Sequence, residues 1–276
     1  MNRCFGWAAA MAAVLLIGCA SPEEGAATAP NAEPPAPEAP PPAVVRIPAP
    51  QPTILPEETP APPEPTKGLV GVFPHVRLDA ASRCVEFDGV VPIDCHDART
   101  PTVYLEVVAC LRNTKEHEAI VVTDALPSHV HAALLAAGLV PGKPGSWRVE
   151  QRQLITIPPE GPEVTVTISW RDGAGVEISR SAEDMVLSAE NKRHLREAGA
   201  RWLFAGSRFV NFQGKEFYDA DGMGTLVGLA TFGAETIAWS RVLSHESAVQ
   251  EPEWIADGAM IPPFGTPVVV RIKPTR

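Results

Sequence analysis

The chain has 276 residues, of which 30 are proline, and a formal net charge of −10. Sixteen of the prolines lie between Cys19 and Lys67, which excludes helix and central strand from that segment and leaves about 210 residues for one folded domain. From residue 67 onward the chain has 21 basic and 26 acidic residues, without the basic excess of a nucleic-acid-binding surface. We therefore expect one folded domain and no nucleic-acid partner.

Residues 1–18 have the features of a lipoprotein signal peptide. Arg3 supplies a positive charge, and the apolar run that follows from Phe5 is about thirteen residues long, too short to span a bilayer comfortably. This run leads into the sequence Leu-Ile-Gly-Cys, which ends at Cys19 and looks like a bacterial lipobox, in which the cysteine is lipidated and becomes the mature N-terminus. The alternative is an ordinary secretory leader or a short membrane anchor with an incidental cysteine. We expect an exported protein with lipid on Cys19.

Residues 19–67 form a segment of Pro, Ala and Glu that cannot bury enough apolar surface to fold. In polyproline II geometry, at ~3.1 Å per residue, its reach is on the order of 150 Å. We expect a lipid-anchored, disordered and semi-rigid tether, with a ligand for a proline-recognition domain as the alternative. Ala20 stands where Asp would favour inner-membrane retention, so the expected location is the outer membrane, facing the periplasm or the cell surface. The expected partners are the membrane and an envelope protein or cell-wall component.

From Gly68 the composition changes to short apolar runs separated by Gly and Asp. Before the first helix, strands are predicted at residues 76–78, 84–87, 104–110 and 119–123. The first two of these strands are expected to form a hairpin. A helix is predicted over residues 126–137, because Val130, Leu134 and Ala137 recur at helical spacing and Gly138 stands where a C-terminal cap would.

The second half of the domain is also predicted to be rich in strands. Apolar residues alternate from Val164 to Trp170, which predicts a half-buried strand that turns at Gly173 and returns. A second helix is predicted over residues 181–198, and a hairpin turn over 218–224. Further strands are predicted at 202–204, 226–232 and 268–272. Strands outnumber helices without alternating with them, so we expect an α+β domain: a mainly antiparallel sheet with one or two packed helices.

Five segments occur in a fixed order along the domain: Thr114-Lys-Glu-His-Glu-Ala119, Thr123-Asp-Ala-Leu-Pro-Ser-His-Val-His-Ala-Ala-Leu-Leu135, Gly138 with Pro141-Gly142, Arg201-Trp-Leu-Phe-Ala-Gly-Ser207, and Ile261-Pro-Pro-Phe-Gly-Thr-Pro267. Together they resemble the YdjY-domain family of exported bacterial lipoproteins, with the domain at residues 68–276. The resemblance implies export but no particular activity. The member that names the family is described as ferredoxin-like, and this chain has no cysteine run able to hold an iron–sulfur cluster.

Three cysteines remain after the leader and the lipid site, namely Cys84, Cys95 and Cys110. In an oxidising compartment an odd number suggests one disulfide and one buried thiol. The family resemblance implies the pair Cys95–Cys110, and Cys84–Cys95 is the alternative.

The richest group of polar residues, which we call the polar cluster, consists of Lys115, Glu116, His117, Glu118, Asp124, His129 and His131. Zinc requires three or four converging N, O or S donors. On a helix, His129 and His131 lie about 200° apart and cannot share one ion. A zinc site would therefore combine His117, one helix histidine and a carboxylate such as Asp124 or Glu118.

A structural role for the polar cluster is the leading interpretation. His117 and Glu118 would then hold a loop against the start of the helix, where Asp124 or Ser128 caps free backbone N–H groups. The sequence has no serine-hydrolase, phosphate-loop or dinucleotide-binding motif. We therefore expect a non-enzymatic binding or structural domain without a cofactor. The alternative is a metal-dependent hydrolase or metal-binding protein with zinc, using His117, Glu118, His129 and His131.

Overall fold

The computed structural model describes residues 68–275, apart from 98 and 101. The predicted signal peptide, the lipid site at Cys19 and the predicted tether at 19–67 lie outside the described residues.

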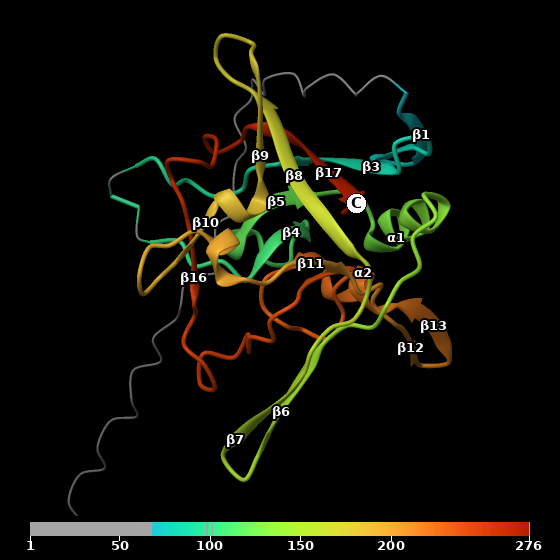
Figure 1. The fold of residues 1–276 in the computed structure, drawn as a ribbon, viewed down its shortest axis with the longest axis vertical. Coiled ribbons are helices and arrows are strands. Elements are labelled where there is room, and N and C mark those ends of the chain that lie inside the picture. The colour runs from blue at the N-terminus through green and yellow to red at the C-terminus, as the bar shows by residue number, and fades with distance from the viewer. Residues whose placement is uncertain (1–67, 98, 101, 276) are drawn as a thin grey trace, which may run out of the picture. The chain divides into compact units, whose positions relative to one another are not determined.

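Eight strands of the largest sheet form a closed barrel (Figure 1). Neighbouring strands are antiparallel except for the pairs β4–β5 and β14–β15, which are parallel. In order around the barrel the strands are β3 (Cys84–Val90), β17 (Pro267–Pro274), β8 (Glu163–Arg171), β11 (Trp202–Phe204), β15 (Ile237–Trp239), β14 (Thr225–Gly228), β4 (Val107–Leu111) and β5 (Ala119–Thr123). The pairing of β5 with β3 completes the ring.

The barrel closes where Val90 of β3 pairs with Val122 of β5. Gly89 makes this approach possible, because a Cβ atom there would lie 2.3 Å from Cγ1 of Val121 and 2.9 Å from the carbonyl oxygen of Val122. The hydroxyl of Thr123 adds a hydrogen bond of 2.5 Å to the carbonyl oxygen of Asp88. Only glycine fits at this seam without moving one of the two strands.

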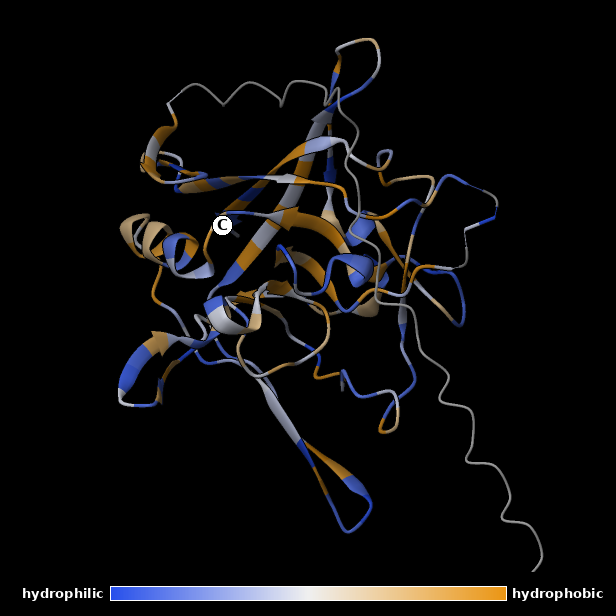
Figure 2. Ribbon diagram, turned by 180° about the vertical axis from the view of Figure 1, so that it is seen from behind, coloured by the Kyte–Doolittle hydropathy of each residue, from blue (hydrophilic) through white to orange (hydrophobic). Residues whose placement is uncertain are grey.

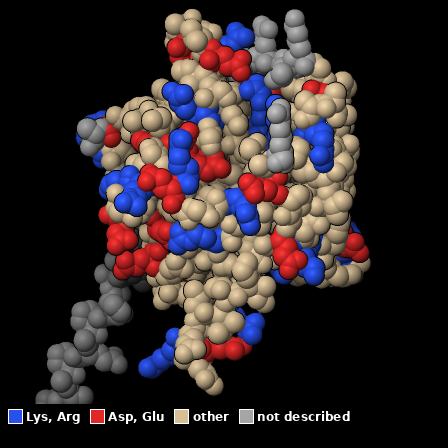
Figure 3. Space-filling view, viewed as in Figure 1, with Lys and Arg blue, Asp and Glu red and all other residues tan. Residues whose placement is uncertain are grey.

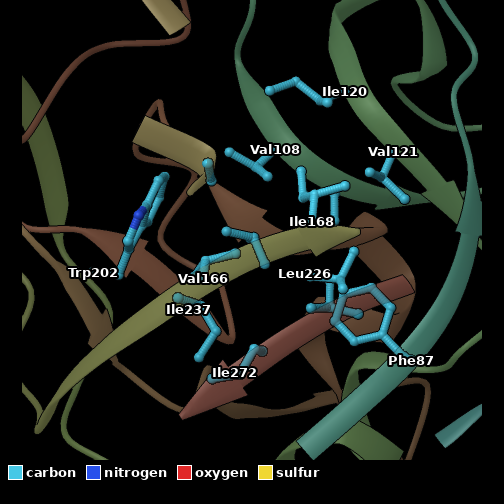
Figure 4. Close-up of a cluster of buried hydrophobic side chains, with 14 of the residues drawn as sticks. Phe87, Val108, Ile120, Val121, Val166, Ile168, Trp202, Leu226, Ile237 and Ile272 are labelled. Atoms are coloured by element: carbon cyan, nitrogen blue, oxygen red, sulfur yellow. The ribbon is translucent and has the colours of Figure 1, made fainter. Parts of the chain in front are cut away.

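Apolar side chains fill the barrel. Figure 4 shows side chains from different strands, including Phe87, Ile168, Leu226 and Ile272, directed into one shared interior. The predicted alternation along β8 is confirmed, since Val164, Val166, Ile168 and Trp170 are all buried. Burial of each large side chain stabilises the fold by roughly 1.5–3 kcal/mol. In Figure 2 the strands around this interior are mostly hydrophobic and many of the connecting loops hydrophilic.

The remaining strands lie outside the barrel. Three extend its sheet: β1 (Val70–Phe73), β2 (Val76–Asp79) and β9 (Glu177–Ser181). Six form two-stranded sheets: β6 (Ser146–Glu150) with β7 (Gln153–Ile157), β10 (Val186–Ser188) with β16 (Trp254–Ala256), and β12 (Phe209–Phe212) with β13 (Lys215–Tyr218). The predicted hairpin is confirmed as β2–β3, and the predicted return strand as β9.

Two α-helices pack beside the barrel, α1 (Pro127–Ala136) and α2 (Asp219–Met223). The first helix is the one predicted from the sequence, and Gly138 follows it with a positive φ of 80°. Its N-terminal cap differs from the prediction, because a carboxylate oxygen of Asp221, in α2, accepts the N–H of Ser128 at 2.8 Å. The two helices therefore hold each other in place.

The predicted α+β class is wrong, because the described residues form a mostly β protein around a closed barrel. The helix predicted over residues 181–198 is instead two short 3-10 turns, Ala182–Asp184 and Leu195–Ala198, with β10 between them. Pairing of β10 with the distant β16 overrides the local helical pattern. The segment predicted as a hairpin turn at 218–224 forms α2.

Acidic and basic side chains are interspersed over the face in Figure 3. Both signs occur at the β6–β7 hairpin, where Arg148 pairs with Glu150. In the part of the chain that the structure describes, no helix has both the length and the apolar character needed to cross a membrane.

One acidic side chain is buried completely in a network of ions on the outer face of the sheet. Glu86 is 0% exposed and accepts from Arg77 at 2.9 Å and from Arg271 at 2.7 Å. The strand register places Glu86 directly between these two arginines. Arg77 also binds Asp88, and Arg271 lies 3.3 Å from Glu177. The buried charge is thus balanced on both sides.

Candidate functional site

The parallel pairing of β4 and β5 places two glutamates side by side. Val107 is in register with Ala119, so the residues before them, Glu106 and Glu118, are neighbours at the same end of the two strands. The N–H of Glu106 donates to the carbonyl oxygen of Glu118 at 3.1 Å. The carbonyl oxygen of Glu106 accepts two further N–H groups, from Leu229 and Ala230. The backbone therefore fixes this carboxyl pair.

The carboxyl group of Glu106 is harder to ionise than a free carboxyl group, because its pKa is raised. Burial raises the pKa of Glu106 to about 7, and the negative charge of Glu118 and a hydrogen bond between the two side chains raise it further in the same direction. No Lys, Arg or His among the described residues lies within ion-pair distance of Glu106. Such a pair can exchange a proton or bind a cation.

The carboxyl pair lies on the wall of a cavity of about 220 Å³. Most of the remaining lining comes from Trp254 of β16 and from the loop before it, residues 243–253. Apolar and polar groups both contribute to the lining, among them Leu105, Glu106, Glu118, Leu243, His245 and Trp254. We call this the glutamate cavity.

Trp254 separates the glutamate cavity from a second cavity of about 190 Å³, since it and Glu253 line both. Its side chain is nearly buried, with 4% exposed, and its indole N–H has no hydrogen-bond partner among the described residues. Arg241 lies over the indole ring and forms an ion pair with Glu253 at 2.9 Å. This N–H group is itself shielded, so it does not open into either cavity.

Lys115 lies close to the carboxyl pair but is occupied by other groups. Its ammonium donates to the carbonyl oxygen of Met223 at 2.7 Å and to the hydroxyl of Thr225 at 3.3 Å, and lies 4.6 Å from the ring centre of Phe232. Burial lowers the pKa of Lys115, although Glu106 and other acids raise it. This lysine moderates the charge of the carboxyl pair without neutralising it.

His245, in the lining of the cavity, is fixed by aromatic contacts. It stacks on Phe232 with ring centres 4.6 Å apart and meets Trp147 edge-on at 5.5 Å. Trp147, at the base of the β6–β7 hairpin, donates its indole N–H to the carbonyl oxygen of Thr231 at 2.9 Å. The hairpin base therefore supports this wall of the cavity.

The chain matches one known protein family. The family model for the YdjY domain matches residues 76–273. The chain belongs to the YdjY domain family. No curated protein and no solved structure matches it. The resemblance drawn from the five sequence segments is confirmed.

The YdjY domain brings only part of the predicted polar cluster to the glutamate cavity. Glu118 lines the cavity and Lys115 lies behind it. Glu116 binds locally instead, accepting the N–H of Thr114 at 2.9 Å. The side chain of His117 is 78% exposed and lies 3.6 Å from the carboxylate of Glu118. His117 does not reach the helix, so its predicted role in holding the loop there is wrong.

The other members of the polar cluster lie in different surroundings. Asp124 forms an ion pair with Arg112 at 2.9 Å. His129 stacks on Phe73 of β1, with ring centres 4.7 Å apart. His131 forms a hydrogen bond of 2.7 Å through Nδ1 to the hydroxyl of Tyr218, and burial lowers its pKa. The contacts of the two histidines join β1 and β13 to α1.

The proposed zinc set of His117, Glu118, His129 and His131 is not assembled. Each of the three histidines contacts a different group. Within the described residues no three His, Cys, Asp or Glu side chains converge as metal ligands would. The described structure therefore does not support a zinc site made of these residues.

The predicted disulfide is absent as well. Cys84, Cys95 and Cys110 are all free thiols, which overturns both Cys95–Cys110 and the alternative Cys84–Cys95. Cys110 is buried on β4, where burial raises its pKa to about 11. Cys95 instead packs against Gly258, far along the chain. The strand pairing therefore places these thiols in different environments.

The sequence interpretation missed Glu106, His245 and Trp254. Glu106 had a signal, because it is the only charge in the apolar run at 103–110. A charged side chain in a strand that is otherwise buried needs a partner or a function. His245 and Trp254 had none, since they reach the YdjY domain cavity only through the fold.

Proposed function

We propose that this protein is a lipid-anchored protein of the cell envelope whose YdjY domain is a non-enzymatic binding module. Lipid on Cys19 would hold it on the membrane, with the segment 19–67 as a tether. The proposed location is the outer membrane, with the domain facing the periplasm or the cell surface. The proposed partner is an envelope protein or a cell-wall component.

The glutamate cavity is the proposed binding site. The observation that supports it most is the carboxyl pair Glu106–Glu118, held by the backbone at the wall of a cavity of about 220 Å³. Like charges directly opposite each other destabilise a sheet, so this pair costs stability that a ligand would recover. The apolar residues Leu105 and Leu243 give the same cavity a surface for the ligand's carbon skeleton.

Anchoring is tested by changing the proposed lipid site. The variant Cys19→Ser should remain unprocessed and lack lipid, because the thiol that accepts the lipid is gone. Metabolic labelling with a radioactive fatty acid measures this directly. Cys4→Ser is the matched control, since it removes the other leader cysteine and keeps the lipobox. Labelling of the Cys19→Ser protein would contradict the proposal.

Binding at the glutamate cavity is tested with soluble cell-wall muropeptides and the full chain in detergent. Calorimetric titration should show saturable binding that weakens at least tenfold in Glu106→Ala. Glu163→Gln, on β8 and outside the cavity lining, should bind as the unchanged chain does. Equal binding by Glu106→Ala would contradict the cavity assignment, and cleavage of the muropeptides would contradict a non-enzymatic role.

A further inference from the structure

The glutamate cavity is strongly acidic. Four of its lining residues are glutamates: Glu106, Glu118, Glu251 and Glu253. The only basic side chain in the same lining is His245. Its Nδ1 lies 3.1 Å from the carbonyl oxygen of Thr231, so that nitrogen faces the backbone and not these acids.

Internal partners balance only part of this charge. Arg241 neutralises Glu253, and the exposed His117 lies 3.6 Å from Glu118. The hydrogen-bonding neighbour of Glu106 is Glu118, and the ammonium group of Lys115 donates to the carbonyl oxygen of Met223. Glu86, in contrast, has an arginine on each side. The cavity therefore keeps an excess of negative charge directed at whatever fills it.

The same lining also offers apolar surface. Trp254 is 4% exposed and lines the cavity, while its indole N–H is shielded from the cavity space. Leu105 and Leu243 lie in the lining as well. The complement of acidic and apolar groups in one cavity is a cationic group on a short carbon chain.

We propose that the glutamate cavity binds an organic amine, with the carboxyl pair Glu106–Glu118 as the counter-ion of its ammonium group. This inference rests on the proposed binding function of the same cavity and adds the chemical class of the ligand. An ammonium group between the two carboxylates would remove their repulsion and take the place of the proton on Glu106. The free amino group of a diamino acid or of a peptide has this chemistry.

Binding should depend on pH because the proton on Glu106 and the ammonium group compete for one position. The pKa of Glu106 is about 7, so Glu106 is mostly protonated at pH 6 and mostly ionised at pH 8. Amine affinity should therefore rise about tenfold between these two pH values. The charged and titratable groups that face the pair are Lys115, His117, His245, Glu251 and Glu253.

The experiment is calorimetric titration of the full chain in detergent with three probes of similar size: lysine amide, norleucine amide with its α-amino group acetylated, and glutarate. They are respectively cationic, neutral and anionic at pH 8. Lysine amide should bind, and its affinity should fall at least tenfold in Glu106→Gln and in Glu118→Gln. Glu163→Gln is the matched control and should leave the affinity unchanged. The pH dependence should disappear in Glu106→Gln and remain in His245→Gln.

The outcomes separate the ligand class from the binding function. Binding of the neutral probe or of glutarate in place of lysine amide overturns the amine inference and leaves the cavity as a binding site. Amine binding that survives in both glutamine variants overturns the role of the carboxyl pair. Absence of binding by all three probes, together with muropeptide binding that Glu106→Ala abolishes, also overturns the amine class while the proposed function stands.

Discussion

Glu86 and Glu106 are two glutamates of the same barrel that the fold treats in opposite ways. Glu86 is completely buried, and arginines on both neighbouring strands bind its carboxylate. Glu106 is only partly buried, and the side chain next to it is another glutamate. A buried acid with two cationic partners belongs to the stability of the fold, whereas an acid paired with a like charge at a cavity costs stability. The difference identifies which of the two is available for a ligand.

The largest expected effect is that of breaking the Glu86 network. Glu86→Ala leaves Arg77 and Arg271 facing each other without their shared counter-ion, so the free energy of unfolding should fall by about 3–5 kcal/mol. Urea unfolding of the full chain at pH 7 measures this. The variant should still bind lysine amide wherever it remains folded, because Glu86 does not line the glutamate cavity. A loss below about 1 kcal/mol would show that the network does not stabilise the fold as its geometry indicates.

The next largest effect on stability is expected at His131, a histidine of the polar cluster that has a hydrogen-bond partner. His131 binds the hydroxyl of Tyr218, which in turn donates to the carbonyl oxygen of Gly206 at 2.9 Å. A double-mutant cycle of His131→Ala and Tyr218→Phe should give a coupling of about 1 kcal/mol at pH 8. Burial lowers the pKa of His131 in the folded state, so the unfolded chain takes up the proton first. Stability from this residue is therefore lost as pH falls below about 6.5. Additive effects of the two substitutions would argue against the bond.

The sequence predicts local features of this protein well and long-range ones poorly. The alternation along β8, the β2–β3 hairpin and α1 with Gly138 after it all follow from spacing within a short window. Closure of the barrel depends on Gly89, whose role is visible only once β3 meets β5. The helix predicted at 181–198 fails for the same reason, because β10 is stabilised by a strand about seventy residues away.

Only part of the candidate site could be predicted from the sequence. Glu118 and Lys115 stood out in a group of polar residues, but the partner of Glu118 lies twelve positions earlier, in a run that reads as strand. Parallel pairing of β4 with β5 is what brings the two glutamates together. Histidines dominated the interpretation because of their chemistry as metal ligands, although three of them contact separate groups. Two like charges on neighbouring strands can be recognised as a pair only when the pairing of the strands is known.

Removing the charge of Glu106 should raise the free energy of unfolding, whereas removing the side chain of Glu86 should lower it. The pKa of Glu106 is about 7 in the folded protein and near 4.5 when unfolded, so the folded state binds more protons between these values. The stability that this group contributes is complete below about pH 4.5 and is lost as pH rises through 7. At pH 8 Glu106→Gln should therefore raise the free energy of unfolding by about 1 kcal/mol, after allowance for solvent screening.

Urea unfolding of Glu106→Gln at pH 5 and pH 8 measures this difference. At pH 5 the substitution should change stability little, because the wild-type carboxyl group is already protonated in the folded state. Glu235, which is buried and whose pKa is also raised, should give the same trend in both proteins and so cancels in the comparison. A Glu106→Gln protein that is less stable than the wild type at pH 8 would contradict the repulsion between Glu106 and Glu118.

The smallest expected effect is at His117, the residue that drew most attention in the sequence. Its side chain is 78% exposed, and it lies 3.6 Å from the carboxylate of Glu118. An exposed pair of this kind contributes about 0–1 kcal/mol, so His117→Gln should change the free energy of unfolding by less than about 0.5 kcal/mol at pH 8. Its effect should stay smaller than that of His131→Ala under the same conditions. A loss of more than about 1 kcal/mol would mean that His117 packs against the fold in solution, and the contrast between exposed and partnered histidines would then fail.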